Sequence, residues 1–279
     1  MARVMPGAVC AALLLVLCSP RADGAFERDV AVASVDAVCC AGAPSELVRL
    51  LAPSPDDAVS QPDAGERVRW SVGVTTGELY GLTALRSTEV TVARQASRHL
   101  LSLEASTFGS PVYREQVASL AGSGRWSQNA AVGVKGFARG IAWGGGGSEW
   151  TGTVDVSAAW LVGGRLVLGL SIGNVGHASV LSSRVSSQVA VGATLVLEDV
   201  ALLAAVTGEP EFDPSPAFGC ELVLTRWARL RGGVRMEPAS AGVGLCLSSG
   251  ASPRPDVDLA WSWHPVLGPS YSLTVTVHL

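Results

Sequence analysis

The last nine residues of the chain alternate between apolar and polar side chains without interruption. The apolar set is Tyr271, Leu273, Val275, Val277 and Leu279. The polar set is Ser272, Thr274, Thr276 and His278. A period of two over a whole segment predicts a β-strand with one apolar face and one polar face. The same alternation recurs upstream, so the chain from Val68 onward is predicted to run strand, turn, strand.

Turn residues separate the stretches that carry the strand pattern. These stretches are 68–76, 87–96, 98–108, 128–142, 149–162, 166–174, 186–197, 200–208, 216–225, 229–237, 241–248, 255–264 and 270–279. Tight connections such as 163–165 predict antiparallel neighbours. Longer connections are expected at 144–147, 176–184, 209–215 and 249–254, and short turns on one side with longer loops on the other suit a membrane barrel.

One helix is expected to interrupt the strands, at about 111–121. Ser110 suits a helix cap, Pro111 suits the first helical position, and Gly122 suits the helix end.

The faces of the strands distinguish a membrane barrel from a soluble sandwich. In 153–160, 166–173, 188–197, 218–225 and 256–264 the bulky apolar set carries no charge, and every charge falls on the other set. That other set is mostly Gly, Ala, Ser and Thr, whereas a water-facing sheet would carry far more Lys and Glu. Small residues suit the interior of a modest barrel. The predicted fold is an all-β, antiparallel, up-and-down transmembrane β-barrel of about 12–14 strands, closed by pairing of 270–279 with 68–76.

The N-terminal part of the chain is expected to be an export signal followed by a leader. Arg3 precedes an apolar stretch at 8–18, and Ala22-Asp23-Gly24 fits a small-x-small cleavage site. The predicted organisation is a signal peptide at 1–24, a leader or plug at 25–66 and the barrel at 67–279. No later stretch approaches about 18 consecutive apolar residues. The expected location is the outer membrane of a diderm bacterium.

Composition and motifs argue against several other classes. Charged residues make up only 16% of the 279 residues, the net charge is −4, and Lys135 is the sole lysine, so a nucleic-acid partner is not expected. Cys220 and Cys246 lie on non-neighbouring predicted strands, which favours small buried side chains over a disulfide framework. No catalytic constellation or metal-ligand spacing is present. The chain is therefore predicted to be a non-enzyme without a cofactor.

Charges on the inward set are the candidate functional residues. They are Lys135, Asp155, Glu221, Arg229, Arg231, Arg235, Asp256 and Asp258. A three-residue turn at 226–228 would set Arg231 opposite Val223 and diagonal to Glu221. Such charges either line a polar channel or form a satisfied network that fills the lumen. The network is the favoured interpretation, because acidic and basic groups of similar number cancel.

Tryptophans are candidate interface residues. They are Trp70, Trp126, Trp143, Trp150, Trp160, Trp227, Trp261 and Trp263, and most lie near predicted strand ends. Membrane barrels carry aromatic girdles at both interfaces. The alternative is ordinary core packing.

Several segments resemble the FadL-like outer-membrane barrels, and within them the PorV/PorQ-like branch. They are "PVYREQ", "VDVSAAWLVGGRLVLGLSIGNVG" at 154–176, "FGCELVLTRWARLRGGVRMEP" at 218–238 and "VDLAWSWHPVLGPSYSLTVTV" at 257–277. The resemblance covers roughly 68–279. It implies an outer-membrane barrel, often of about 14 strands, that carries hydrophobic molecules or assists protein secretion. The chain departs from the family pattern in lacking an Asn-Pro-Ala segment after the signal and in ending on Leu279 rather than an aromatic residue.

The favoured function is passage of hydrophobic small molecules or an accessory role in secretion or assembly. The alternatives are a structural or surface-exposed barrel without transport, and a periplasmic soluble β-protein that binds a partner. The expected partners are outer-membrane lipid and either a hydrophobic small molecule or secretion-machinery proteins.

Overall fold

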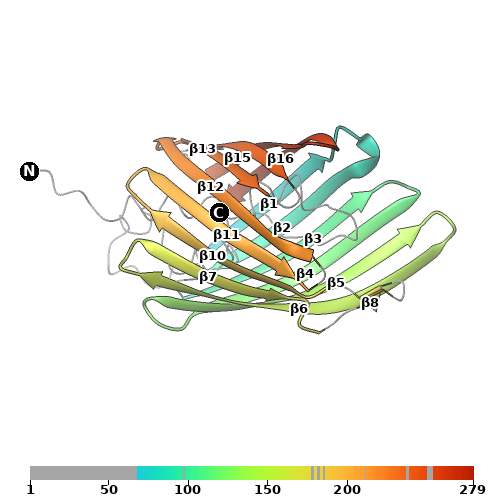
Figure 1. The fold of residues 1–279 in the computed structure, drawn as a ribbon, viewed down its shortest axis with the longest axis horizontal. Coiled ribbons are helices and arrows are strands. Elements are labelled where there is room, and N and C mark those ends of the chain that lie inside the picture. The colour runs from blue at the N-terminus through green and yellow to red at the C-terminus, as the bar shows by residue number, and fades with distance from the viewer. Residues whose placement is uncertain are drawn as a thin grey trace, which may run out of the picture.

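Fourteen strands form one closed antiparallel sheet in which successive barrel strands are neighbours (Figure 1). The computed structural model describes residues 68–96, 98–176, 179–180, 183–184, 186–210, 212–236, 239–249 and 254–279. The barrel strands are β1 (Arg69–Glu78), β2 (Arg86–Gln95), β3 (His99–Gly109), β4 (Tyr113–Arg125), β5 (Ala130–Trp143), β6 (Gly147–Val162), β7 (Leu166–Gly173), β10 (Gln188–Val196), β11 (Val200–Glu209), β12 (Phe212–Thr225), β13 (Ala228–Arg235), β14 (Ser240–Ser248), β15 (Arg254–His264) and β16 (Gly268–His278).

Small elements lie in two of the connections. A single 3-10 turn, η2 (Thr83–Leu85), lies between β1 and β2, and a two-stranded sheet of β8 (Ser179–Val180) and β9 (Ser183–Arg184) lies between β7 and β10. Within the described ranges, no helix has the length and hydropathy needed to cross a membrane. The predicted signal peptide and the predicted leader or plug lie outside the described residues, and both stay predictions.

The barrel closes between its first and last strands, as the alternation at 270–279 predicted. Val74 pairs with Val275 and Thr75 with Thr274, and the Leu279 N–H donates to the Trp70 carbonyl oxygen at 2.8 Å. β1 pairs with β2 on its other side. Closure satisfies the backbone of both strands, which is what distinguishes a barrel from a sandwich with free edges.

The predicted helix at 111–121 is wrong, because this segment is part of β4. Glu115 and Val117 are buried and face inward, Gln116 and Leu120 are exposed, and β4 pairs with β3 and β5 along its length. The Ser110 hydroxyl accepts hydrogen bonds from the N–H groups of Val112 and Tyr113. A helix cap uses the same chemistry, so the cap signal was real but belongs to the β3–β4 turn.

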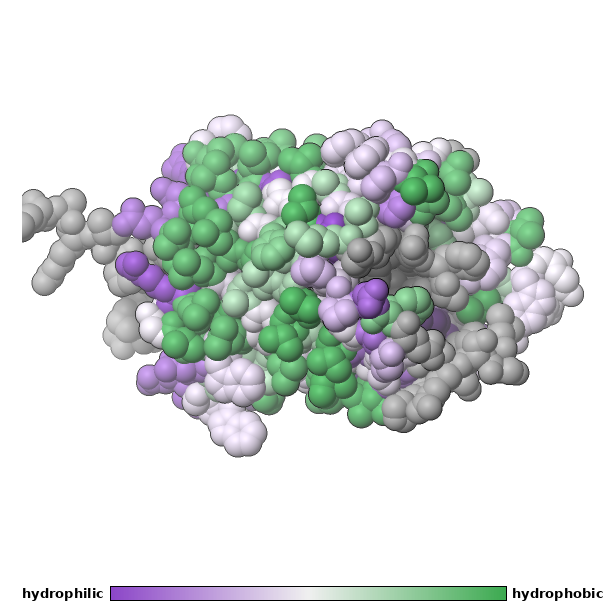
Figure 2. Space-filling model, viewed as in Figure 1, coloured by the Kyte–Doolittle hydropathy of each residue, from purple (hydrophilic) through white to green (hydrophobic). Residues whose placement is uncertain are grey.

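Apolar side chains cover the outside of the barrel, and polar or small side chains face inward. In β16, Tyr271, Leu273 and Val275 are exposed, whereas Ser270 is buried. Figure 2 shows apolar residues spread over the strands on the visible face, with hydrophilic residues gathered at the rim on the left. The strands assigned two faces from sequence follow the same rule: Leu259, Trp261 and Trp263 are exposed, and Asp256 is buried.

The described chain begins and ends at the same end of the barrel, here called the terminal end and seen on the left in Figure 1. The opposite end, called the loop end, carries the two longest connections, 79–85 and 174–187. The expected loops at 144–147 and 209–215 are shorter than predicted, because β6 extends into the first and β11 and β12 extend into the second. The connection after β14, expected as a longer loop, lies at the terminal end.

Candidate functional site: the inner face of the barrel

The inward charges fall into two groups on different parts of the wall. Register places Lys135 on β5 opposite Asp155 on β6. The larger group lies on β12, β13 and β15, where Glu221 and Arg231 are paired across the first two strands. Its other members are Arg229, Arg235, Asp256 and Asp258.

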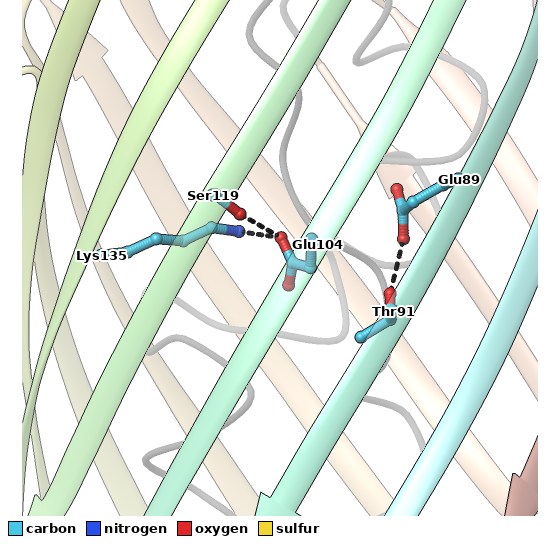
Figure 3. Close-up of polar contacts among 5 residues, drawn as sticks. All are labelled: Glu89, Thr91, Glu104, Ser119 and Lys135. Carbon is cyan, nitrogen blue, oxygen red and sulfur yellow. Dashed lines mark hydrogen bonds and ion pairs between the residues drawn. The ribbon is translucent and has the colours of Figure 1, made fainter.

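Lys135 forms an ion pair that sequence reasoning did not identify. Its Nζ atom lies 2.5 Å from Oε2 of Glu104 on β3, and the Ser119 hydroxyl on β4 donates to the same oxygen at 2.8 Å (Figure 3). These three side chains connect three successive strands across the inner wall. The signal for Glu104 was present in the sequence, since it shares the inward set of its strand with Ser102. Nearby, the Thr91 hydroxyl donates to Oε1 of Glu89 at 3.1 Å.

Asp155 accepts a hydrogen bond where β7 ends. Its Oδ1 atom accepts from the backbone N–H of Asn174 at 2.8 Å. Asn174 has a φ of 53°, a left-handed conformation that Asn tolerates better than most residues. The Thr153 hydroxyl donates to Oδ1 of Asn174 at 2.6 Å. Asp155 therefore helps to fix the point at which the chain leaves the barrel wall for the 174–187 connection.

The larger group contains one ion pair that crosses a strand and one contact between neighbouring strands. Arg231 on β13 forms an ion pair with Asp258 on β15, passing over β14, where Gly244 pairs with Arg231 and has no side chain to block the approach. The Nε2 atom of His278 on β16 lies 3.1 Å from Oδ2 of Asp256 on β15. Together these contacts join β13, β15 and β16 on the inner face.

The register at Glu221 differs from the sequence expectation. Arg231 lies directly opposite Glu221, not diagonal to it, and Arg229 takes the place opposite Val223. The β12–β13 connection has two residues, and an irregularity between Val223 and Thr225 shifts the pairing. The observed pairing differs from the expected one by two residues, so the same side chains stay on the inner face. Only 1% of Glu221 is exposed, so water screens the attraction between its carboxylate and the opposing Arg231 very little.

Bulky apolar side chains also face inward, and sequence reasoning missed them. Phe108 contacts Leu79, Phe137 contacts Val117, and Ile141 is buried two residues after Arg139 on the same face. We call these five apolar residues the inner apolar patch; it consists of two separate clusters and Ile141, with Glu115 and Arg139 on the same face between them, and it lies toward the loop end of β1 and β3–β5. Lys135 borders the patch, with Nζ 5.0 Å from the centre of the Phe137 ring.

All of the tryptophans are exposed, from 39% for Trp143 to 82% for Trp126. At the terminal end these are Trp70, Trp126, Trp160 and Trp227, and at the loop end Trp143, Trp150, Trp261 and Trp263. Register places Trp143 in the inward set with Lys135 and Arg139, at the tip of β5. Its ring covers Gly147, its cross-strand partner. The other seven lie on outward positions or in turns, which are the positions expected for an aromatic girdle at the membrane interfaces.

The remaining candidate chemistry gives no site in the described residues. Cys220 is exposed on the outer face, Cys246 is buried on the inner face, and both are free. No group of three or more His, Cys, Asp or Glu residues in these ranges is arranged to hold a metal ion.

Comparison with known proteins identifies solved barrels that share the architecture of this chain. No protein-family model matches the chain, and no curated protein matches it in sequence. Solved barrels match its fold at low identity. The Ralstonia pickettii toluene transporter TbuX gives a TM-score of 0.55 at 10% identity, covering 85% of this chain and 94% of its own. The Pseudomonas putida toluene transporter TodX gives 0.55 at 9% identity, covering 88% and 96%.

Two further solved structures support the same architecture. A Pseudomonas aeruginosa FadL homologue gives a TM-score of 0.51 at 10% identity, covering 86% of this chain and 97% of its own. The CymD monoaromatic hydrocarbon channel gives 0.52 at 10% identity, covering 77% and 88%. The chain has the fold of a FadL-like outer-membrane barrel. At these identities the likeness concerns the fold alone.

Proposed function

We propose that the protein is a non-enzymatic barrel of the outer membrane through which hydrophobic small molecules pass. The outward apolar set gives the barrel a surface that matches lipid, and all of its strands except β7 and β13 have the about 9–11 residues that a tilted strand needs to cross a bilayer. Barrels of the same architecture include proteins named as transporters of toluene and a channel for monoaromatic hydrocarbons. The terminal end would face the periplasm, since bacterial barrels have their short turns there.

The inner apolar patch is the observation that carries this proposal. A water-filled porin has a polar interior, whereas Phe108, Phe137 and Ile141 are buried aromatic and aliphatic side chains on the inner face of this barrel. Contact with such a surface stabilises an apolar solute by about 25 cal/mol for each Å² removed from water. The patch lies toward the loop end, where a solute from outside the cell would arrive first.

The inward charges are proposed to be structural. Arg229, Arg231 and Arg235 on β13 are balanced in number by Glu221 on the neighbouring β12 and by Asp256 and Asp258 on β15, one strand further along the wall. Ion pairs and hydrogen bonds that run from strand to strand hold the wall together and leave little net field to select an ion.

Uptake in cells tests the proposal. The full chain is expressed in a bacterium that lacks hydrocarbon transporters, and its folded state is confirmed by heat-modifiable migration on a gel. Entry of radiolabelled toluene is then compared for the wild type, the inward double variant F108S/F137S and the outward control L103S/V134S. The wild type should exceed the vector control several-fold, the inward variant should lose most of that gain, and the outward control should keep it.

Equal uptake with folded barrel and with empty vector would reject transport and favour a barrel that presents loops without passage. Equal uptake by the wild type and F108S/F137S would reject the role of the inner apolar patch. An accessory role in secretion stays a prediction from the sequence resemblance.

A further inference from the structure

One buried carboxylate on the inner face lies among apolar side chains. Glu115 on β4 is 0% exposed, and its register partners on the two neighbouring strands are Phe108 on β3 and Ile141 on β5. Both partners belong to the inner apolar patch. A carboxylate is costly to bury in such surroundings unless its oxygens accept hydrogen bonds, so the hydrogen bonds of Glu115 determine whether the group is satisfied.

The two carboxylate oxygens of Glu115 differ in their hydrogen bonding. The Oε1 atom accepts from the Tyr113 hydroxyl at 2.7 Å. The Oε2 atom is buried and has no hydrogen-bond partner in the structure described for this chain. Arg139, the register partner of Val117, lies diagonally from Glu115 on the same face, and it does not donate to Oε2. A strong acceptor in the wall of the barrel is therefore unused.

Two other buried carboxylates on the inner face lie in different surroundings. Glu104 is satisfied, because its Oε2 atom pairs with Lys135 and accepts from Ser119 (Figure 3). Glu221 also has oxygens without a hydrogen-bond partner, but it lies directly opposite Arg231 rather than between two apolar side chains. Glu115 combines an unused acceptor with apolar surface on both sides, and a polar group in an apolar site is what orients a ligand.

The position of Glu115 along β4 suits entry from the loop end. Tyr113 lies one inward position nearer the rim and is partly exposed, and its register partner Trp143 is exposed at the tip of β5. A solute that enters from the loop end meets these two aromatic residues first. Because Glu115 is fully buried, the solute reaches Oε2 by displacing side chains nearer the rim.

We propose that Glu115 is the specificity-determining residue of the passage, and that its Oε2 atom accepts a hydrogen bond from the hydroxyl group of a phenolic solute. The ring of the phenol packs against Phe108 and Ile141. A plain hydrocarbon gains the apolar contact but leaves Oε2 unpaired, whereas a phenol supplies ring and donor together. A carboxylated aromatic solute brings a second negative charge to Glu115 and is disfavoured. The inference rests on the proposed function and deepens it by naming a substrate class.

Fluorine NMR on the full chain, purified into phosphatidylcholine nanodiscs, tests this selectivity. Binding of 4-fluorophenol is compared with binding of 4-fluorotoluene, in which a methyl group of similar size replaces the hydroxyl, and empty nanodiscs correct for partition into lipid. The wild type should bind the phenol on the order of tenfold more tightly, as one hydrogen bond to a charged group allows. The anion 4-fluorobenzoate should bind no better than the hydrocarbon.

Two variants and a matched control locate the acceptor, and heat-modifiable migration on a gel confirms that each barrel is folded. Glu115→Met removes the acceptor, so it should abolish the preference for the phenol and still bind 4-fluorotoluene. Glu115→Gln keeps a neutral acceptor, whose hydrogen bond is about half as strong, so the preference should fall to about threefold. Glu149→Gln is the control, since Glu149 is partly exposed and is the register partner of Ile141 on β6; it should leave the preference unchanged.

Equal binding of the two solutes by the wild type, or a full preference in either Glu115 variant, would overturn the assignment to Glu115. Equal losses in Glu115→Met and Glu149→Gln would overturn it in favour of a general effect of negative charge. Preferential binding of 4-fluorobenzoate would overturn it in favour of an anion site. If the folded wild type binds none of the three solutes, the proposed function fails as well, whereas binding of 4-fluorotoluene without preference for the phenol rejects only the inference at Glu115.

Discussion

Removing the ammonium group of Lys135 should destabilise the barrel, because the buried Glu104 carboxylate is left without its ion-pair partner. The side chains of Lys135 and Glu104 are only 17% and 9% exposed, and 2.5 Å separates their charged atoms. The Coulomb attraction between the two charged groups is about 6–7 kcal/mol at an effective dielectric constant of about 20. Most of this attraction is cancelled by the loss of hydration of both groups. Breaking a buried pair from one side costs about 3–5 kcal/mol. Because the Ser119 hydroxyl still donates to Glu104, we expect about 3 kcal/mol for Lys135→Met.

The reciprocal change should cost less. Glu104→Gln leaves the Lys135 ammonium without its closest acid, but Asp155 is the register partner of Lys135 on the same inner face. A loss of about 1–2 kcal/mol is expected, the size of a hydrogen bond to a charged group. The double variant K135M/E104Q should also lose about 1–2 kcal/mol, because neither charge remains. The resulting coupling of about 2–4 kcal/mol would show that the two residues act as a pair.

Urea unfolding in phosphatidylcholine vesicles, followed by tryptophan fluorescence, measures these differences. Arg165→Gln is the control, since it removes one positive charge from an exposed turn and should change the unfolding free energy by no more than about 0.5 kcal/mol. The reasoning is refuted if Lys135→Met unfolds within 0.5 kcal/mol of the wild type, or if the two single losses simply add.

Two other predictions concern the closure and the outer face. In a background without native cysteines, V74C and V275C should form a disulfide, because these residues are register partners of β1 and β16. The oxidised barrel should then stay compact on a gel after heating, whereas V74C with L273C should cross-link poorly. In variants that keep a single tryptophan, brominated lipid should quench Trp261 strongly and Trp143 weakly, since register places only Trp261 on the outer face; equal quenching would show that Trp143 also faces lipid.

Much of the fold followed from local alternation, and the main error came from a local signal as well. The apolar and polar faces of β15 and β16 could be read directly, because a strand turns successive side chains to opposite sides. That alternation is absent between Glu115 and Ala121, where polar and apolar residues occur on both faces of the strand. There the Ser110-Pro111 pair and Gly122 suggested a helix. Burial of Glu115 and Val117 between β3 and β5 decided the conformation.

The candidate site depended more on long-range structure. The sequence indicated that Lys135, Glu221 and Arg231 point inward, but it did not indicate their partners. The two-residue connection and the irregularity in β12 set Arg231 opposite Glu221, and the small Gly244 allows Arg231 to reach Asp258 across a strand. Glu104 and Lys135 are two strands apart, and the pairing of β3 and β5 with β4 between them brings the two side chains together.

By itself, then, the sequence determined most of the strand content and the two faces of the strands, because side-chain alternation is a property of each strand alone. The tertiary structure decided the strand at 113–125, the ion pairs across the lumen and the grouping of the inner apolar patch. These depend on register, and register is set by turns, bulges and neighbouring strands rather than by any single segment.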